Sequence, residues 1–445
     1  MHDTATGQKS DRPSVLVVTD QLPYPPRNGL TLPLYHYVLG LMKSRDVKLA
    51  LLVEGNDGPA AADLTANERI FGKIEIIPFD RAPKLSRIVG EVLGKEMYQH
   101  GWVLKESYRS SDALRAESIL VSPMSAVAKW RASGLTRALG ARVSIAAVHD
   151  CTAASYLYRS KQAFGGFKLR LKGQVDRLRA SRIAKIEHDL LCDYRAILLQ
   201  TEKDKKLIQD VVSDGLTDQI VLVPNGVGEE YFDLQRCELP DRPKVVFVAE
   251  LSGEYGPIAR WVVDDVWSKV VATNPAAELL VVGKGASPGL RERFSSATNV
   301  VYTEFVPDLC EIYARASVVL SPVFKGYGLI NKTLEGMASG VTVVGGVAAF
   351  NGIQGFELGV HGMACDAGDA DSFATAISRL LRDSALRTQI GRAARDLLRS
   401  QFKWEFAVDK INGIIDQGTA RESVDVRTPL PNPTALRSGS ETATL

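Results

Sequence analysis

One segment in the C-terminal half of the chain combines the residue types that binding a diphosphate and a sugar would require. Gly326 and Gly328 follow a short apolar run and let a ligand approach the backbone closely. A helix expected from about Leu329 would present unpaired N–H groups and the positive end of its dipole, which bind anions. Lys332 adds a charge suited to a diphosphate, and Glu335, one turn later, can accept hydrogen bonds from sugar hydroxyls. By themselves these residues fit a nucleotide-diphosphate pocket and a tight turn with a helix cap about equally well.

Other patterns that could carry chemistry are weaker. Asp369 and Asp371 have the Asp-x-Asp spacing of a metal motif, but they lie where a helix is expected to begin, so a capping role is favoured. The five cysteines are scattered, without a CxxC pair or a Cys/His cluster of zinc spacing. This usage is typical of reduced thiols in a cytoplasm. The sequence therefore predicts no metal site and no cofactor.

The elements that must position these residues are short, apolar, β-branched runs separated by helical segments. Such runs are typical of strands buried on both faces of a parallel sheet. The spacing implies right-handed crossovers and a doubly wound sheet. In the first half the expected strands are 14–19, 47–53, 73–78, 143–148, 196–199 and 220–223. After a polar stretch with two prolines the pattern restarts, at 244–248, 278–282, 300–303, 318–321 and 341–344.

This repetition predicts two Rossmann-like, doubly wound domains that face a cleft, and 445 residues are enough for both. Ligands of such sheets bind at the carboxyl ends of the strands. Helices at 371–382 and 385–400 would complete the second domain. The expected division is a disordered N-terminus 1–13, a first domain 14–235, a linker 236–243, a second domain 244–400, a helix 401–415 that crosses back to the first domain, and a disordered tail 416–445.

Charge and hydropathy limit the partners. Lys plus Arg number 54 against 52 Asp plus Glu, so the overall charge gives no reason to expect a nucleic-acid partner. The first thirteen residues lack the apolar run of a signal peptide, and no stretch approaches the length of a membrane span. We therefore expect a cytosolic protein, or one acting on a membrane from the cytosolic side. The stretch 168–185 carries seven basic residues and one acidic residue, with apolar residues at roughly helical spacing. It fits an anionic membrane surface and a solvated helix face equally well.

The segment 321–344 resembles glycosyltransferase family 4, the retaining enzymes with the GT-B fold, and in particular its bacterial polysaccharide-type members. The family phrase reads approximately Gly-x-Gly-x-x-Asn-Lys-x-Leu-Glu-Ala-Met-Ala-x-Gly. Further similar segments cover the second domain in order: 261–267, 274–283, 305–309, 313–322 and 402–404. In the first half the resemblance is thinner and is limited to 25–29, the His-Asp dipeptide 149–150 and the Asn-Gly dipeptide 225–226.

The resemblance implies a role for each matching residue. Glu335 would hold the ribose of a nucleotide-sugar donor. Lys332, following Asn331, would hold the pyrophosphate together with the backbone of Gly328, Leu329 and Ile330. Gly29 would lie beneath the diphosphate, where a plain loop glycine is the alternative. His149 would face the donor sugar as the catalytic residue, the alternative being a structural histidine at a strand end.

The implied activity is transfer of a sugar from a nucleotide-diphosphate sugar, with retention of configuration, to a polysaccharide or lipid-linked acceptor. Two departures from the family pattern bear on it. Tyr327 replaces a glutamate that usually contacts the donor sugar, and 249–256 lacks the basic residues that many members place near the leaving phosphate. Lys325 or Arg260 could substitute for them. These departures favour one alternative, a non-catalytic GT-B relative acting as a partner or scaffold. A further reading, another GT-B chemistry such as sugar-nucleotide epimerisation, would require additional acid/base carboxylates, which the sequence does not reveal.

Overall fold

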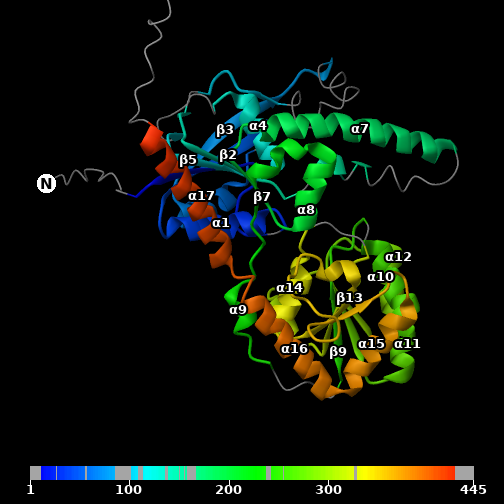
Figure 1. Cartoon of the computed structure of the whole chain (residues 1–445). Helices are drawn as coiled ribbons and strands as arrows, with labels where there is room; N and C mark the ends of the chain where they lie inside the picture. Colours follow the sequence, from blue (N-terminus) through cyan, green and yellow to red (C-terminus); the bar gives the residue numbers. More distant parts are fainter. Residues whose placement is uncertain are drawn as a thin grey trace, which may run out of the picture.

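The chain folds into two α/β domains, one above the other in Figure 1. The structure is a computed structural model that describes residues 12–26, 28–55, 58–85, 102–108, 114–135, 139–149, 151–154, 156–157, 167–236, 242–253, 255–324 and 328–425; the side chains of 167–172 and 420–425 are outside this description. The expected α/β class, with two doubly wound domains, is confirmed.

The first domain is built on an eight-stranded sheet in the order β4-β3-β2-β1-β5-β6-β7-β8. All neighbouring strands pair in parallel except β4, which runs antiparallel to β3. The central strands are almost wholly buried because helices cover both faces, which explains their continuous apolar runs. The strands are β1 (Ser14–Thr19), β2 (Asp46–Glu54), β3 (Ile74–Arg81), β4 (Trp102–Leu104), β5 (Ser118–Val121), β6 (Val143–Ala147), β7 (Ala196–Leu199) and β8 (Ile220–Leu222).

Two groups of helices cover this sheet. The core on one face includes side chains of α4 and α7, and the core on the other includes those of α1, α2 and the C-terminal helix α17. The helix α7 is the long one that projects to the right in Figure 1. The helices are α1 (Thr31–Met42), α2 (Ala61–Phe71), α4 (Met124–Ser133), α7 (Phe167–Leu191), α8 (Glu202–Leu207) and α9 (Glu229–Phe232), of which α9 packs on the second domain.

The second domain has a six-stranded, wholly parallel sheet in the order β11-β10-β9-β12-β13-β14. This is the strand order of a Rossmann fold, with the first strand of the domain at the centre. The strands are β9 (Lys244–Val248), β10 (Glu278–Val282), β11 (Val300–Thr303), β12 (Val318–Ser321), β13 (Thr342–Gly346) and β14 (Met363–Cys365).

Helices also cover both faces of the second sheet. A π-helical turn (Val262–Trp267) joins α10 to α11, so the chain is helical without a break from Tyr255 to Thr273. Asp369 caps α15 by accepting from the N–H groups of Asp371 and Ser372, as expected for the Asp-x-Asp turn. The helices are α10 (Tyr255–Trp261), α11 (Ser268–Thr273), α12 (Pro288–Ser296), α13 (Leu309–Ala314), α14 (Asn331–Ala338), α15 (Ala370–Arg382) and α16 (Ser384–Arg399).

Two chain segments pass side by side between the domains. Val227 and Lys403 form an isolated parallel bridge, and α17 (Trp404–Asp425) then runs along α1 of the first domain (Figure 1). The helix continues ten residues beyond the boundary expected at 415, because its next turn still packs. Asp416 pairs with Arg45 at 2.7 Å, and Gly418 lies against Val143. The expected start of a disordered tail at 416 is therefore wrong; the expected tail and N-terminus otherwise lie outside the described residues.

Three strands were not predicted. The sequence around β5 is rich in Ser and Arg, and the three apolar residues of this four-residue strand are too few to distinguish a strand from a buried helical turn. Yet β5 lies at the centre of the sheet between β1 and β6. The strands β4 and β14 have three residues each and lie at sheet edges, where pairing rather than hydrophobic pattern defines them.

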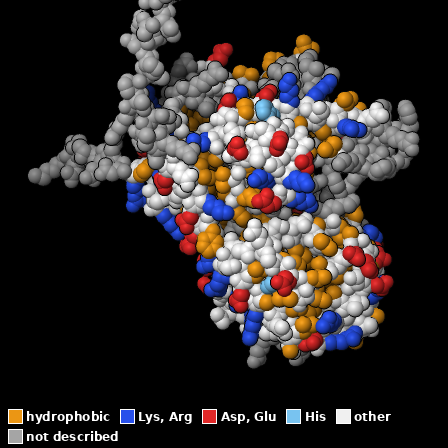
Figure 2. Space-filling model, in the orientation of Figure 1, with side chains coloured by type: hydrophobic (Ala, Val, Ile, Leu, Met, Phe, Trp, Pro, Cys, Tyr) orange, Lys and Arg blue, Asp and Glu red, His pale blue; other side chains and the backbone are white. Residues whose placement is uncertain are grey.

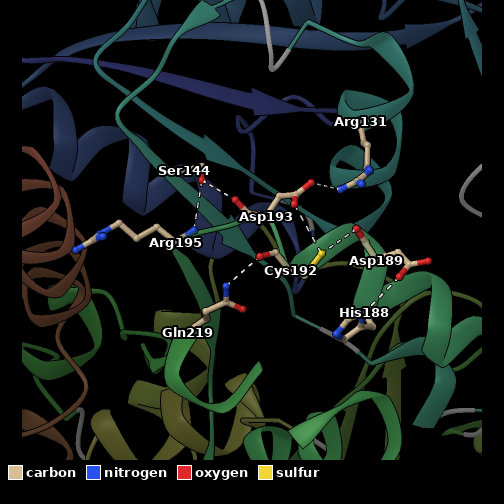
Figure 3. A network of polar contacts seen from close by, with 8 residues as sticks. All are labelled: Arg131, Ser144, His188, Asp189, Cys192, Asp193, Arg195 and Gln219. Carbon is tan, nitrogen blue, oxygen red and sulfur yellow. Dashed lines mark hydrogen bonds and ion pairs between the residues drawn. The ribbon is translucent and has the colours of Figure 1, made fainter. Parts of the chain in front are cut away.

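A polar network joins the chain at the amino end of the first sheet, on the side opposite the domain interface. Asp193 accepts from Arg131 of α4 at 2.6 Å, and the N–H of Arg195 donates to Ser144 at the start of β6 (Figure 3). The side chain of Gln219 donates to the carbonyl of Cys192 at 3.0 Å. The network ties α4, α7, β6 and β8 together, so its role is structural.

On the face shown in Figure 2, basic and acidic side chains are interspersed. Within the described part of the chain, no helix is both long enough and apolar enough to span a bilayer.

Candidate donor site between the domains

A cavity of about 540 Å³ opens between the domains at the carboxyl ends of their strands. Four of the predicted site residues line it: Gly29, which follows β1, and Asn331, Lys332 and Glu335 of α14. The structure thus brings residues about three hundred positions apart into one pocket. The remaining lining residues come from the loop after β1, α1, the crossing segments, α9, α13 and α14: Pro26, Asn28, Leu32, Tyr35, His36, Gly226, Val227, Gly228, Glu230, Tyr231, Leu309, Leu334 and Trp404.

The helix α14 holds the charged part of this cavity rigidly. It begins at Asn331, two residues later than expected, with Ile330 at its N-cap and no side chain capping it. Thr333 is fully buried, and its hydroxyl lies 2.8 Å from that of Ser321 at the end of β12. Gly340 ends the helix with a φ of +69°, the left-handed conformation expected for it.

Lys332 and Glu335 form an ion pair on the cavity side of this helix. The Lys332 Nζ lies 2.9 Å from Oε2 and 3.1 Å from Oε1 of Glu335. Glu335 is buried, and loss of hydration raises the pKa of its carboxyl although the nearby Lys332 acts in the opposite direction. Both carboxylate oxygens of Glu335, which were expected to accept ribose hydroxyls, therefore already contact the Lys332 ammonium.

Two side chains of the first domain contact the backbone of the loop before α14. The N–H of Gly328 donates to Oδ1 of Asp204 at 3.0 Å, and the N–H of Leu329 points to Oε1 of Gln200 at 3.5 Å. Asp204 belongs to α8, and Gln200 follows β7 directly. These two amides were predicted to contact a pyrophosphate, so side chains of the first domain stand where the ligand was expected.

His149 lies beyond this contact, at the end of β6. Its Nδ1 is 3.2 Å from Nε2 of Gln200, and its Nε2 is 3.3 Å from the hydroxyl of Ser122. The same Gln200 nitrogen donates to Asn225 Oδ1 at 3.0 Å. Because this nitrogen is a donor, Nδ1 of His149 accepts and the ring carries its proton on Nε2, toward Ser122. Burial lowers the pKa of His149 to about 4, so the ring is neutral at pH 7.

His149 lies outside the cavity but is joined by hydrogen bonds to Asn331, which lines it. Asn225 donates from Nδ2 to Oδ1 of Asn331 at 3.2 Å, which completes a polar chain from Ser122 to α14. His149 is not among the residues that line the cavity. The Gln200 side chain contacts both His149 and the N–H of Leu329, which precedes α14.

The segment after His149 is held by a buried carboxylate. Oxygens of Glu187 in α7 accept from the N–H groups of Thr152 and Ala153 at 2.8 and 3.3 Å. The thiol of Cys151 lies 3.6 Å from the same carboxylate, and burial together with Glu187 raises its pKa. Burial and Glu187 thus both disfavour the thiolate form of Cys151, and Glu187 holds the backbone N–H groups of Thr152 and Ala153.

Aromatic rings form the wall of the cavity nearest the domain crossing. His36 of α1 and Trp404 of α17 stack with ring centroids 4.2 Å apart and planes 7° apart. Burial lowers the pKa of His36 to about 4. Gly226 lies against this stack, and a Cβ at that position would overlap the backbone of Trp404.

Lys325 and Tyr327 lie outside the described residues. Arg260 donates to the carbonyl of Gly289 and pairs with Asp264, both in the second domain. Gln200, Asp204 and His36 were missed by sequence reasoning. One signal for Gln200 was available: it follows a predicted strand directly, as His149 does, and parallel strands end at the same edge of a sheet. Among the described residues, no group of three or more His, Cys, Asp or Glu side chains could hold a metal ion.

Comparison with known proteins agrees with this architecture. Residues 242–383 match the family model of the glycosyl transferases group 1. A GDP-mannose-dependent monoacylated alpha-(1-6)-phosphatidylinositol monomannoside mannosyltransferase of Corynebacterium glutamicum is 24% identical over 159 residues, 33% of this chain and 41% of that protein. The sulfoquinovosyl transferase SQD2 of Arabidopsis thaliana is 26% identical over 237 residues, 49% of this chain and 44% of that protein. The chain thus matches less than half the length of these relatives.

Solved structures match over nearly the whole chain. The Anabaena protein Alr3699/HepE, in complex with UDP and glucose, has a TM-score of 0.61 and 15% identity, with 90% of this chain and 99% of that chain covered. The sucrose-phosphate synthase of Thermosynechococcus elongatus has a TM-score of 0.59 and 17% identity, with 92% and 100% covered.

The two Rossmann-like domains and the cavity between them define the GT-B fold. Residues 242–383, in the second domain, are similar to the glycosyl transferases group 1.

Proposed function

We propose that this protein is a glycosyltransferase that moves a sugar from a nucleotide-diphosphate sugar to a polysaccharide or lipid-linked acceptor, with retention of configuration. One observation carries the proposal: Gly29 of the first domain and Asn331, Lys332 and Glu335 of the second line one cavity at the carboxyl ends of both sheets. The relatives named for transfer from GDP-mannose and for sulfoquinovosyl transfer support the class of reaction.

In this proposal the protein acts by position and charge. Ribose hydroxyls replace the Lys332 ammonium at Glu335, and the freed ammonium turns to the pyrophosphate. The N-terminal end of α14 adds its dipole, which stabilises the charge that builds on the leaving diphosphate. The acceptor attacks from the side of the leaving group, so no protein nucleophile is required, and no metal ion is needed to hold the phosphates. Neutral His149 offers a hydrogen bond to the donor sugar rather than a charge.

The first test is binding. UDP, GDP and their sugars are added to the wild type and to Glu335→Ala, and thermal unfolding is followed. A ligand at a hundredfold over its Kd stabilises the native state by about 2.7 kcal/mol. If one nucleotide stabilises the wild type but not Glu335→Ala, the result would support the donor pocket and identify the nucleotide base of the donor.

Binding without turnover on any acceptor would favour the non-catalytic alternative. If no nucleotide stabilises the wild type, the proposed donor site is wrong.

We also propose that α7 docks the protein on an anionic membrane, which would bring it to a lipid-linked acceptor. Val175 and Leu178 are 40% and 64% exposed, and Arg182 and Lys185 continue the same stripe at helical spacing. The side chains of the basic residues at 168, 170 and 172 are outside the described part of the structure. Exposed apolar residues beside basic ones are typical of interfacial helices.

Cosedimentation with phosphatidylglycerol and phosphatidylcholine vesicles tests this docking. Leu178→Ser and Lys185→Glu should each reduce binding to the anionic vesicles, whereas Lys269→Glu on the second domain should not. Equal binding by all variants would contradict a role for α7.

A further inference from the structure

Asp204 divides its two carboxylate oxygens between the domains. Its Oδ2 accepts from the N–H and hydroxyl of Thr201, at 3.0 and 2.7 Å, which completes the capping box of α8. Its Oδ1 accepts from the N–H of Gly328, which belongs to the second domain, at 3.0 Å. The residue is 7% exposed, so the contact is largely shielded from water.

The backbone conformation of Gly328 favours this contact. Its φ of +74° lies in the left-handed region, which places its N–H toward the first domain at little cost for a residue without Cβ. A Cβ at this position would lie 3.4 Å from Oε1 of Gln200. Gln200 is therefore the second side chain seated against the same turn.

A bound donor and Asp204 cannot both use this turn. One N–H makes one strong hydrogen bond, and a carboxylate is the side chain that most resembles a phosphate in charge and acceptor geometry. Two anions about 3 Å apart in a site largely closed to water repel each other strongly. Lys332, the positive group of the adjoining helix α14, is already paired with Glu335.

We propose that Asp204 is an internal substitute for the donor phosphate: it occupies the Gly328 amide in the ligand-free protein and must be displaced when the nucleotide sugar binds. This inference rests on the proposed function and adds to it a device that couples donor arrival to movement of α8. Gln200 is displaced together with Asp204, because its Oε1 contacts the next amide, that of Leu329. Its Nε2 meanwhile donates to His149. Displacement of the pair frees His149 at the moment when the donor arrives.

Isothermal titration with UDP, GDP and inorganic pyrophosphate tests the proposal on the full chain. Asp204→Ala removes the competing anion, and the protein should bind the preferred nucleotide and pyrophosphate about tenfold more tightly, the scale of one charge-assisted hydrogen bond. Asp204→Asn retains an acceptor without the charge and should gain less. Pyrophosphate isolates the phosphate position from recognition of the base.

Thr201→Val is the matched control. It removes the hydroxyl of the capping box but keeps a methyl group against Gly352, which Thr201 contacts, and it leaves Asp204 in place opposite Gly328. It should lower the Tm as Asp204→Ala does, without tightening pyrophosphate binding. Equal tightening in both variants would assign the effect to loss of the cap and overturn the proposal.

Hydrogen exchange without ligand provides an independent measurement. The Gly328 amide should exchange faster in Asp204→Ala than in Thr201→Val; equal rates would overturn the proposal. If the wild type binds nucleotide and Asp204→Ala binds it equally or more weakly, Asp204 is not a competitor. If neither binds any nucleotide or pyrophosphate, the donor site itself fails, and the exchange rates alone show whether Asp204 holds the turn.

Discussion

Lys332 and Glu335 neutralise each other at the centre of the candidate donor site. Their charged atoms lie 2.9 Å apart, with the carboxylate buried and the lysine side chain 40% exposed. The pair is one turn apart on α14, so it forms without any contribution from the first domain. The lysine expected to hold a pyrophosphate is therefore already paired in this structure.

Burial of Glu335 should make the stability of the ligand-free protein depend on pH. The pKa of its carboxyl is raised in the folded state, so the folded protein holds this proton more tightly than the unfolded chain. Stability from this group is then fully present below the unfolded pKa and is lost as the pH rises through the folded pKa. Glu335→Gln cannot ionise, and its stability relative to the wild type should increase from about pH 4 toward neutrality. Urea unfolding at several pH values measures the difference.

Glu229→Gln is the control for that experiment, because Glu229 is half exposed in its 3.0 Å pair with Lys403. Exposed pairs contribute about 0–1 kcal/mol. A falling advantage of Glu335→Gln as the pH rises would contradict the burial argument.

Gly226→Ala should destabilise the domain crossing. The added Cβ would overlap the backbone of Trp404, which cannot move aside as a flexible side chain could. Overpacking of this kind costs about 1–3 kcal/mol. Gly58→Ala, where a Cβ meets nothing within 4 Å, should change the free energy of unfolding far less. Chemical denaturation of both variants checks the prediction; equal stabilities would mean that the crossing adjusts freely.

Gln200→Glu should raise the pKa of His149 from about 4. The amide now donates to Nδ1, whereas a carboxylate there would stabilise the protonated ring. Nitrogen NMR of the imidazole gives the pKa and the tautomer directly. Ser122→Ala removes the contact to Nε2 instead and should leave Nδ1 unprotonated. A proton on Nδ1 in the wild type would show that Gln200 does not set the tautomer.

His36→Phe should make the protein more resistant to acid. Burial lowers the pKa of His36 to about 4, below the ordinary value of 6.5. Its contribution to stability is present above the unfolded pKa and is lost as the pH falls from about 6.5 toward 4. Phenylalanine keeps the stack on Trp404 and cannot be protonated, so unfolding free energy should fall less steeply over this interval.

His36→Asn removes both the proton site and the stacked ring, and it separates the two effects. It should share the shallower acid dependence but lose stability at pH 7. The same acid dependence in wild type and both variants would contradict a role for His36.

The sequence alone determined the two doubly wound domains, because strands buried on both faces must be continuously apolar and helices between them enforce parallel pairing. It also indicated the residues of α14, since a glycine turn, a lysine and a glutamate within ten positions form a local pattern that needs no tertiary information. Its failures were equally physical. The four-residue strand β5 is too short for its sequence pattern to identify it. The helix α17 extends beyond its predicted end because Arg45 and Val143, far away in sequence, contact the residues that follow position 415.

Only the tertiary structure decided what faces α14. Asp204 is a helix-capping residue by its sequence, and nothing local indicates that one of its oxygens crosses to Gly328. The stacking of His36 on Trp404 has no local signal either, whereas Gln200 and His149 each follow a predicted strand. The contact between Asp204 and Gly328 exists because two separately folded sheets place their carboxyl edges together. The other two contacts lie within the first domain, across the neighbouring strands β6 and β7 and between α1 and α17.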